Sequence, residues 1–366
     1  MSRPPGSVKL DPSPASSYNS PSIGRADSRR IACRQDYVTS SGRPGCGVPN
    51  ILGRPPFCVA HPQILEAPLA LAIVFALLSA LGFGSGNILM RIGTQRLSAP
   101  TATFFAVSSG AVVLVCLAFA VELPGIMSLP SVAWAWFALM GAMAYPMARV
   151  LINSSITMIG ASRAAPMSSF QPIFALGLGM TILGERPNLL VGLGTPVVAV
   201  GLILVFLAGT IGDFRGTVLS RESLGYLLAL GGAAAFASRD VISRHVVSGV
   251  APPLVTAAFA LALGGFMLFA LTHRDVVKNL RRVPSRHVVI CSVAGIVLGL
   301  AVASLFQALS RAPVTVVSPI NASNPLITLA LAHFFLRRLE SISLLLVVGT
   351  LLSVGGVAMV ILGAAA

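Results

Sequence analysis

A short polar segment framed by prolines occurs twice in this otherwise apolar sequence. The first copy is Pro166-Met-Ser-Ser-Phe-Gln-Pro172, and the second is Pro319-Ile-Asn-Ala-Ser-Asn-Pro325. Each copy lies within an apolar run long enough to cross a bilayer. Because proline removes a backbone donor and clashes with the preceding turn, two prolines six residues apart break or kink a membrane helix. Broken helices at matching positions of two half-sequences are typical of the binding region of a secondary transporter.

The composition requires a membrane protein. The mean hydropathy is +0.87, and 55% of the residues are hydrophobic while 10% are charged, which excludes a soluble domain. Residues 1–66 differ, because they hold 10 of the 25 prolines and no apolar run above five residues. Such a segment cannot bury enough surface to offset its ordering entropy, so we predict a disordered tail. It has neither the apolar stretch nor the cleavage site of a signal peptide.

A formal net charge of +14 does not indicate nucleic-acid binding in this chain. Eight basic residues lie in the tail, and most of the other 17 are spread over short loops without aromatic residues between them. The five cysteines show no CxxC spacing, so we expect no metal site, no disulfide and no cofactor. The histidines are scattered and no HxxxxD or GxSxG motif is present, which disfavours a polytopic membrane enzyme.

Apolar runs predict ten membrane helices. Each is about 20–25 residues long, as a hydrocarbon layer of roughly 30 Å requires. We therefore predict an all-α polytopic membrane protein in which residues 67–210 form a first five-helix repeat and residues 211–366 a second. The predicted spans are 68–91, 100–121, 131–157, 162–183, 188–209, 223–246, 252–271, 287–309, 313–336 and 341–363.

The second five spans repeat the sequence of the first five. A shift of 153 residues, and of 155 after a two-residue insertion, aligns polar, aromatic, proline and glycine positions: Phe83 with Phe236, Ser85 with Ser238, Arg91 with Arg244, Pro100 with Pro253, Thr103 with Thr256, Glu185 with Glu340, Gly194 with Gly349, and Gly201 with Gly356. Because five is odd, consecutive copies enter the membrane from opposite sides. The repeats are therefore inverted, an arrangement that supports alternating access about a central site.

This layout resembles the EamA-type branch of the drug/metabolite transporter superfamily over about residues 68–363. The resemblance rests on Pro100 and Pro253 at the start of spans two and seven, on the two proline-framed segments, and on Leu183-Gly184-Glu185-Arg186 closing span four. The second half departs from it, with Leu336-Arg-Arg-Leu-Glu340 at the corresponding place. The resemblance implies a secondary transporter, commonly an exporter of amino acids, whose central cavity is lined by spans one, three, four, six, eight and nine.

Span three carries a polar face. Tyr145, Arg149 and Asn153 are spaced i, i+4 and i+8, so they lie along one side of a helix. The guanidinium of Arg149 can bind a substrate carboxylate or phosphate through two hydrogen bonds. The alternative is that Arg149 lies near the end of the span and extends to the lipid headgroups.

Span six carries Arg239 and Asp240 at the positions where span one carries Gly86 and Asn87. Asp240 is the one acid within the body of a predicted span, so it can take part in ion coupling. The alternative is a structural ion pair between spans, with Arg149 or Arg239. Neighbouring residues on a helix point about 100° apart, so Arg239 and Asp240 need not pair with each other.

The two proline-framed segments supply amides. Gln171, Asn321 and Asn324, together with Gln307 of span eight and Asn87 of span one, are candidates to line a binding cavity. The alternative is local, because a kinked helix leaves unpaired carbonyls that amide side chains can satisfy.

These observations predict a secondary-active transporter of small polar or amphipathic metabolites, with amino-acid-like solutes and efflux favoured. A lipid-linked substrate flippase or a nucleotide-sugar or drug exchanger of the same fold is the alternative, and a membrane enzyme is a distant one. The expected partners are a small solute and membrane lipid, and the chain can be a monomer or a homodimer.

Loops after odd-numbered spans hold twelve basic residues against three after even-numbered spans. This distribution predicts that both termini lie outside a prokaryotic plasma membrane, although the basic tail opposes this orientation.

Overall fold

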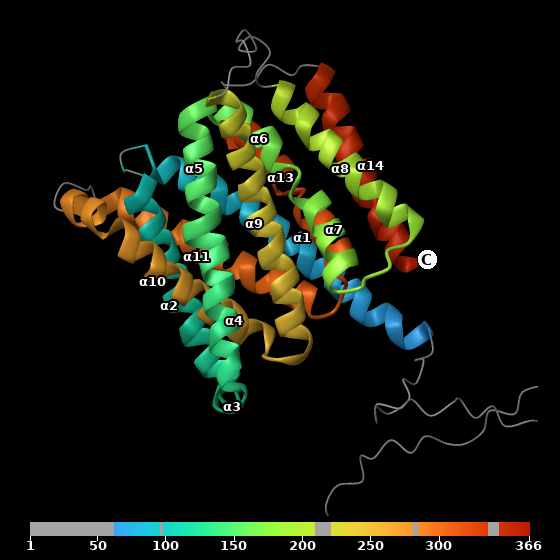
Figure 1. Cartoon of the computed structure of the whole chain (residues 1–366), viewed down its shortest axis with the longest axis horizontal. Helices are drawn as coiled ribbons and strands as arrows, with labels where there is room; N and C mark the ends of the chain where they lie inside the picture. The colour runs from blue at the N-terminus through green and yellow to red at the C-terminus, as the bar shows by residue number, and fades with distance from the viewer. Residues whose placement is uncertain (1–61, 96, 98, 209–220, 281–284, 336–343) are drawn as a thin grey trace, which may run out of the picture. The chain divides into compact units, whose positions relative to one another are not determined.

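The computed structural model describes residues 62–366 except 96, 98, 209–220, 281–284 and 336–343. Residues 1–61 of the predicted tail and Glu340 lie outside the described residues, whereas residues 62–66, which were predicted to belong to the tail, form the start of α1. All described residues belong to one compact unit, Val59–Ala366. Its helices are α1 (Pro62–Gly93), α2 (Ala99–Val121), α3 (Leu123–Met127), α4 (Ser131–Ala142), η1 (Met143–Met147), α5 (Ala148–Ile159), α6 (Ala161–Ser168), α7 (Gln171–Ile182), α8 (Leu189–Ala208), α9 (Arg221–Gly249), α10 (Pro253–Leu280), α11 (Ser285–Leu309), α12 (Val314–Asn321), α13 (Asn324–Phe335) and α14 (Leu344–Ala365) (Figure 1).

The described residues of every predicted span form a single helix or consecutive helical segments. Eight segments of the described chain are long and apolar enough to cross a membrane. The other two predicted spans are the fourth, which is divided into the short helices α6 and α7, and the sixth, α9, which carries Arg239, Asp240 and Arg244. The chain is thus an all-α polytopic membrane protein.

Both proline-framed segments interrupt their spans, as predicted. The fourth span breaks at Ser169 and Phe170, and the ninth breaks at Ala322 and Ser323. Tighter hydrogen bonds to the third preceding residue replace the α-helical pattern there, for example from Ser169 N–H to the Pro166 carbonyl at 3.2 Å. The chain therefore turns at matching points of the two repeats.

The third span contains an irregularity that the sequence analysis missed. The five residues of η1 form a π-helical turn around Pro146, between α4 and α5. Proline has no backbone N–H, so the wider turn accommodates the hydrogen bond that a regular helix would lack. Pro146 was the available signal, and the predicted span over 131–157 did not include this turn.

Helix contacts follow the expected two-fold relation between repeats. Here α1 corresponds to α9, α5 to α11, α7 to α13, α2 to α10 and α8 to α14. The contact of α1 with α11 is matched by that of α9 with α5, and the contact of α1 with α13 by that of α9 with α7. The pairs α2–α10 and α8–α14 each join an element to its own counterpart (Figure 1).

The α8–α14 contact shows the two-fold relation in atomic detail. A Cβ placed on Gly194 would lie 2.9 Å from the Gly356 carbonyl oxygen, and one on Gly201 would lie 2.7 Å from that of Gly349. Gly349 corresponds to Gly194 in the alignment of the repeats, and Gly356 corresponds to Gly201. Gly194 therefore contacts the counterpart of Gly201, and Gly201 contacts the counterpart of Gly194. This reciprocal pattern is that of a two-fold interface, in which the absence of side chains lets the backbones approach closely.

We expect Gly201→Ala to lower the thermal unfolding temperature of the purified protein. The new methyl group would lie 2.5 Å from the Ser353 backbone nitrogen, so the two helices must separate, and overpacking of this kind costs about 1–3 kcal/mol. Gly192→Ala is the matched control, because no atom lies within 4 Å of the position that its Cβ would occupy. Equal unfolding temperatures for the two variants would contradict the close contact.

The two ends of the helical unit are packed differently. We call the end at which α1 begins and α14 ends the proximal end, and the opposite one the distal end. A large buried cluster fills the proximal half, including Leu114, Phe137 and Leu309. Towards the distal end the buried residues form two small separate clusters, one around Leu97, Ala102 and Cys291 and the other around Ile159, Ala164 and Ala229. The unit is therefore tightly packed at the proximal end and divided at the distal end.

Candidate binding cavity

A cavity of about 530 Å³ lies at the level of the two helix breaks and extends towards the distal end. Ser168 and Gln171 reach it from beside the first break, and Asn321 and Asn324 from beside the second. The predicted spans one, three, four, six, eight and nine all contribute, and α2 and α10 add a few residues such as Thr103. Asn87, which also lines the cavity, is exposed, so the cavity is open rather than sealed.

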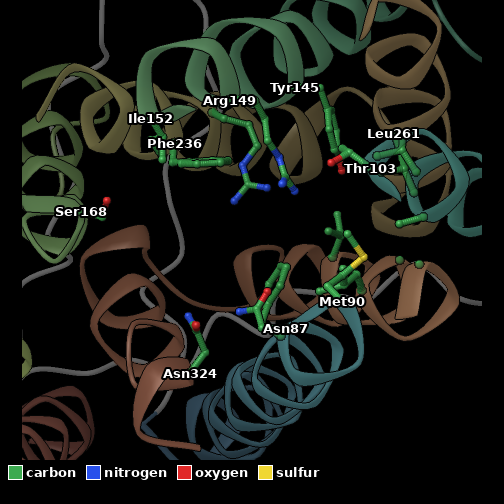
Figure 2. A pocket seen from close by; sticks show the side chains of 18 of the residues that line it. Asn87, Met90, Thr103, Tyr145, Arg149, Ile152, Ser168, Phe236, Leu261 and Asn324 are labelled. Atoms are coloured by element: carbon green, nitrogen blue, oxygen red, sulfur yellow. The ribbon is translucent and has the colours of Figure 1, made fainter. Parts of the chain in front are cut away.

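The predicted polar face of the third span lines the cavity. Tyr145, Arg149 and Asn153 all contribute to its wall, and Arg149 projects into the space from the side of α5 (Figure 2). Arg149 is the second residue of α5, well inside the span that ends at Ile159. It therefore does not extend from a helix end to the headgroups. Its Nε is buried without a hydrogen-bond partner, and within the described residues no carboxylate pairs with it.

Arg239 and Asp240 form an ion pair. Their Nη2 and Oδ1 atoms are 2.5 Å apart, and Gln171 Nε2 donates a hydrogen bond of 3.0 Å to Asp240 Oδ2. Arg239 lines the cavity, whereas Asp240 is 1% exposed and stands behind it. The angle between neighbouring helix positions does not prevent this pair, because the long arginine side chain can fold back along its own helix. The pair lies within α9 rather than between spans.

The opposite wall is neutral and amide-rich. Asn87 projects from α1 and Asn324 from α13, facing the wall from which Arg149 projects (Figure 2). Asn324 Nδ2 donates to the Asn321 carbonyl at 2.9 Å, the group left free because Pro325 has no N–H. Ser79 donates to Asn321 Oδ1 at 3.0 Å, which fixes that amide from α1. Asn324 thus satisfies a backbone carbonyl of its own kinked helix, whereas Gln171 instead bonds to Asp240. Both residues line the cavity.

Gln307 does not line the cavity, contrary to the sequence prediction. Its Oε1 accepts a hydrogen bond of 2.5 Å from Arg311 Nη1, one turn further along the chain. Gln307 lies in the last turn of α11, at the packed proximal end, so its helical position removes it from the site. In the part of the chain that the structure describes, no group of three metal-ligating side chains comes together.

Apolar side chains complete the cavity. Phe83, Met90, Phe236 and Leu298 line it between the polar groups. The sequence analysis did not identify them as lining residues, because an apolar residue facing a cavity has the same local pattern as one facing lipid or protein. The site can therefore hold a solute that has both a polar head and an apolar body.

A family model described as the EamA-like transporter family matches the chain twice, over residues 70–207 and 223–362. The chain belongs to the EamA-like transporter family. The two matches cover both five-helix repeats and confirm the resemblance stated from the sequence.

No curated protein matches. Twenty-nine chains of solved structures are similar, one of them described only as a crystal structure of a protein. That chain shares 19% identity with this one at a TM-score of 0.64, over 80% of this chain and 97% of the other, which supports the fold alone.

The proximal end of this EamA-like chain is held by carboxylates that reach from the first repeat to the second. Glu185, after α7, accepts hydrogen bonds from the backbone N–H groups of Val314 and Thr315 at 2.8 and 3.0 Å, at the start of α12. These N–H groups have no partner within the helix, and the helix dipole favours an anion there. Arg244 donates to the Leu309 carbonyl at the end of α11.

Glu122 makes a similar connection between α2 and α10. It lies in the loop after α2 and accepts a hydrogen bond from the Val255 N–H, in the first turn of α10. Burial raises the pKa of the Glu122 carboxyl above its ordinary value, and the hydrogen bond offsets this only in part. Two acidic side chains of the first repeat therefore cap helices of the second at the same end.

Proposed function

We propose that this chain is a secondary-active carrier that moves small polar or amphipathic metabolites by alternating access, with amino-acid-like solutes and efflux favoured. The observation that carries this proposal is the position of the cavity. It lies at the level of both helix breaks, takes residues from both repeats, and is closed by packing at the proximal end. A midplane site between inverted repeats, exposed to one side at a time, is what such a carrier requires.

We assign the binding role to the polar residues that line this cavity. Arg149 and Tyr145 would hold the charged or polar head of the solute, and the remaining contacts would come from Asn87, Asn153, Gln171, Asn321 and Asn324. Asp240 and Arg239 would couple transport to an ion or maintain the charge balance of the wall. Asp240 is buried behind the cavity wall that Arg239 lines, an arrangement that suits either role.

The distribution of basic residues supports a plasma-membrane orientation with the distal end inside. Twelve of the basic residues follow odd-numbered spans in the sequence, and the described ends of α1, α5 and α8, three of these spans, lie at the distal end. In that orientation the cavity faces the cytoplasm, where an exporter loads its solute.

Transport by purified protein in liposomes tests the proposal. We expect uptake or release of at least part of a library of metabolites, measured with and without a pH gradient, and none in protein-free liposomes. Gly192→Ala serves as a variant with unchanged packing. Movement of fluorescent lipid between leaflets without movement of any soluble solute would favour the flippase instead, and absence of both activities would contradict the proposal.

A further inference from the structure

We propose that the cavity selects solutes of net negative charge, in which a carboxylate is joined to a neutral, partly apolar body, over zwitterions and cations. This inference rests on the proposed transport function and adds the charge state that is carried. Among amino-acid-like solutes, it favours those whose amine is acylated over those with a free ammonium group.

The first step concerns the positive charge of the cavity. Arg149 and Arg239 both line it, and Arg239 is neutralised by Asp240 at 2.5 Å. Arg149 has no such partner among the described residues, and its Nε is buried without a hydrogen bond. An unpaired charge within the span of a membrane protein is unfavourable, and such a protein retains one where it has a use. The empty cavity therefore carries one positive charge in excess, which an anion would balance.

The second step concerns an ammonium group. No aspartate or glutamate occurs among the described residues that line the cavity. Asp240 is 1% exposed, and its two oxygens are already occupied by Arg239 and Gln171. Glu122 and Glu185 cap helices at the proximal end. A zwitterion would bring its ammonium group into a cavity that offers it no counter-ion, so the cost of removing that group from water would not be recovered.

The third step concerns the wall that faces Arg149. Asn87 and Asn324 project from this wall, and an amide both donates and accepts hydrogen bonds without favouring either charge (Figure 2). Phe83, Phe236 and Leu298 supply apolar surface beside them. A carboxylate held by Arg149 through two parallel hydrogen bonds would place a neutral amide or hydroxyl of the same solute against this wall.

The test uses four derivatives of leucine and four of phenylalanine that differ in charge. They are the free amino acid, the N-acetyl acid, the amino amide and the N-acetyl amide, which are zwitterion, anion, cation and neutral molecule respectively. Binding to purified protein in nanodiscs and uptake into proteoliposomes are measured for each. We expect the N-acetyl acids to bind about 10- to 100-fold more tightly than the free amino acids, as hydrogen bonds between charged groups imply.

Arg149→Gln provides the second readout. It should weaken binding of the N-acetyl acids by about 10- to 100-fold and leave the N-acetyl amides nearly unchanged. Because it removes an uncompensated charge, it should also maintain or raise the unfolding temperature of the empty protein. Arg149→Lys should retain part of the preference, since it keeps the charge and loses the two-pronged geometry. Arg91→Gln, at an exposed arginine near the end of α1, is the matched control.

Equal affinity for the anions and the zwitterions would overturn the inference, and so would an unchanged anion affinity in Arg149→Gln. If any of the eight solutes is nevertheless transported, the proposed function still holds. Absence of transport of these solutes and of the wider metabolite library would contradict both.

Discussion

Asp240→Asn should abolish transport and lower the unfolding temperature of the protein. The carboxylate balances the guanidinium of Arg239, which is 7% exposed, and accepts the hydrogen bond from Gln171 at the first helix break. Breaking a buried ion pair by removing one partner costs about 3–5 kcal/mol, because the remaining charge is left without compensation. Uptake into proteoliposomes and thermal unfolding in detergent measure the two effects.

A double variant separates charge balance from transport. Arg239→Gln combined with Asp240→Asn leaves a neutral pair, so we expect the unfolding temperature to recover while transport stays lost. Arg91→Gln, which changes an exposed charged residue outside the cavity, is the control and should transport normally. Normal transport by Asp240→Asn would remove this residue from the mechanism, and normal transport by the double variant would reduce the pair to a structural role.

Glu185→Gln should loosen the proximal end and reduce transport. The carboxylate accepts two backbone hydrogen bonds that join α7 of the first repeat to α12 of the second. Hydrogen bonds to a charged group contribute about 1.5–3 kcal/mol each, so their weakening would change the balance between closed and open proximal ends by at least about tenfold. Transport should fall, because alternating access requires both ends to close in turn.

Cysteine labelling measures this opening directly. Ala312, which is 1% exposed beside the start of α12, is replaced by cysteine in a chain from which the five native cysteines have been removed. We expect an impermeant maleimide to react about tenfold faster at this cysteine when Glu185→Gln is present. Arg186→Gln changes the exposed neighbouring residue and should leave the rate unaltered. An unchanged rate in Glu185→Gln would show that the carboxylate does not hold the end closed.

Local sequence patterns predicted the features that have a local cause. The two helix breaks follow from prolines six residues apart, and the shared face of Tyr145, Arg149 and Asn153 follows from helical spacing. Glu185 was noticed at the end of its span, but its partners lie 129 and 130 residues further along, and no local pattern could identify them. The apolar lining residues were equally hidden, since facing a cavity leaves no mark on the sequence.

Predictions were less successful where the outcome depended on the length of a side chain or on the position of a residue along its helix. The angle between neighbouring helix positions did not predict the Arg239–Asp240 pair, because a flexible arginine spans that angle. Gln307 was a candidate to line the cavity as an amide within a span, but it lies in the last turn of α11, at the packed proximal end.

The reciprocal glycine contacts between α8 and α14 are those that two identical five-helix chains, inserted in opposite directions, would make with each other. Joining two such chains required no new interface. A homodimer of identical chains, however, must present the same groups on both walls of its central cavity. Here the unpaired Arg149 stands on one side, while Val302 occupies the corresponding position on the other. A cavity with one cationic wall and one neutral wall is therefore a property that only the fused chain can have.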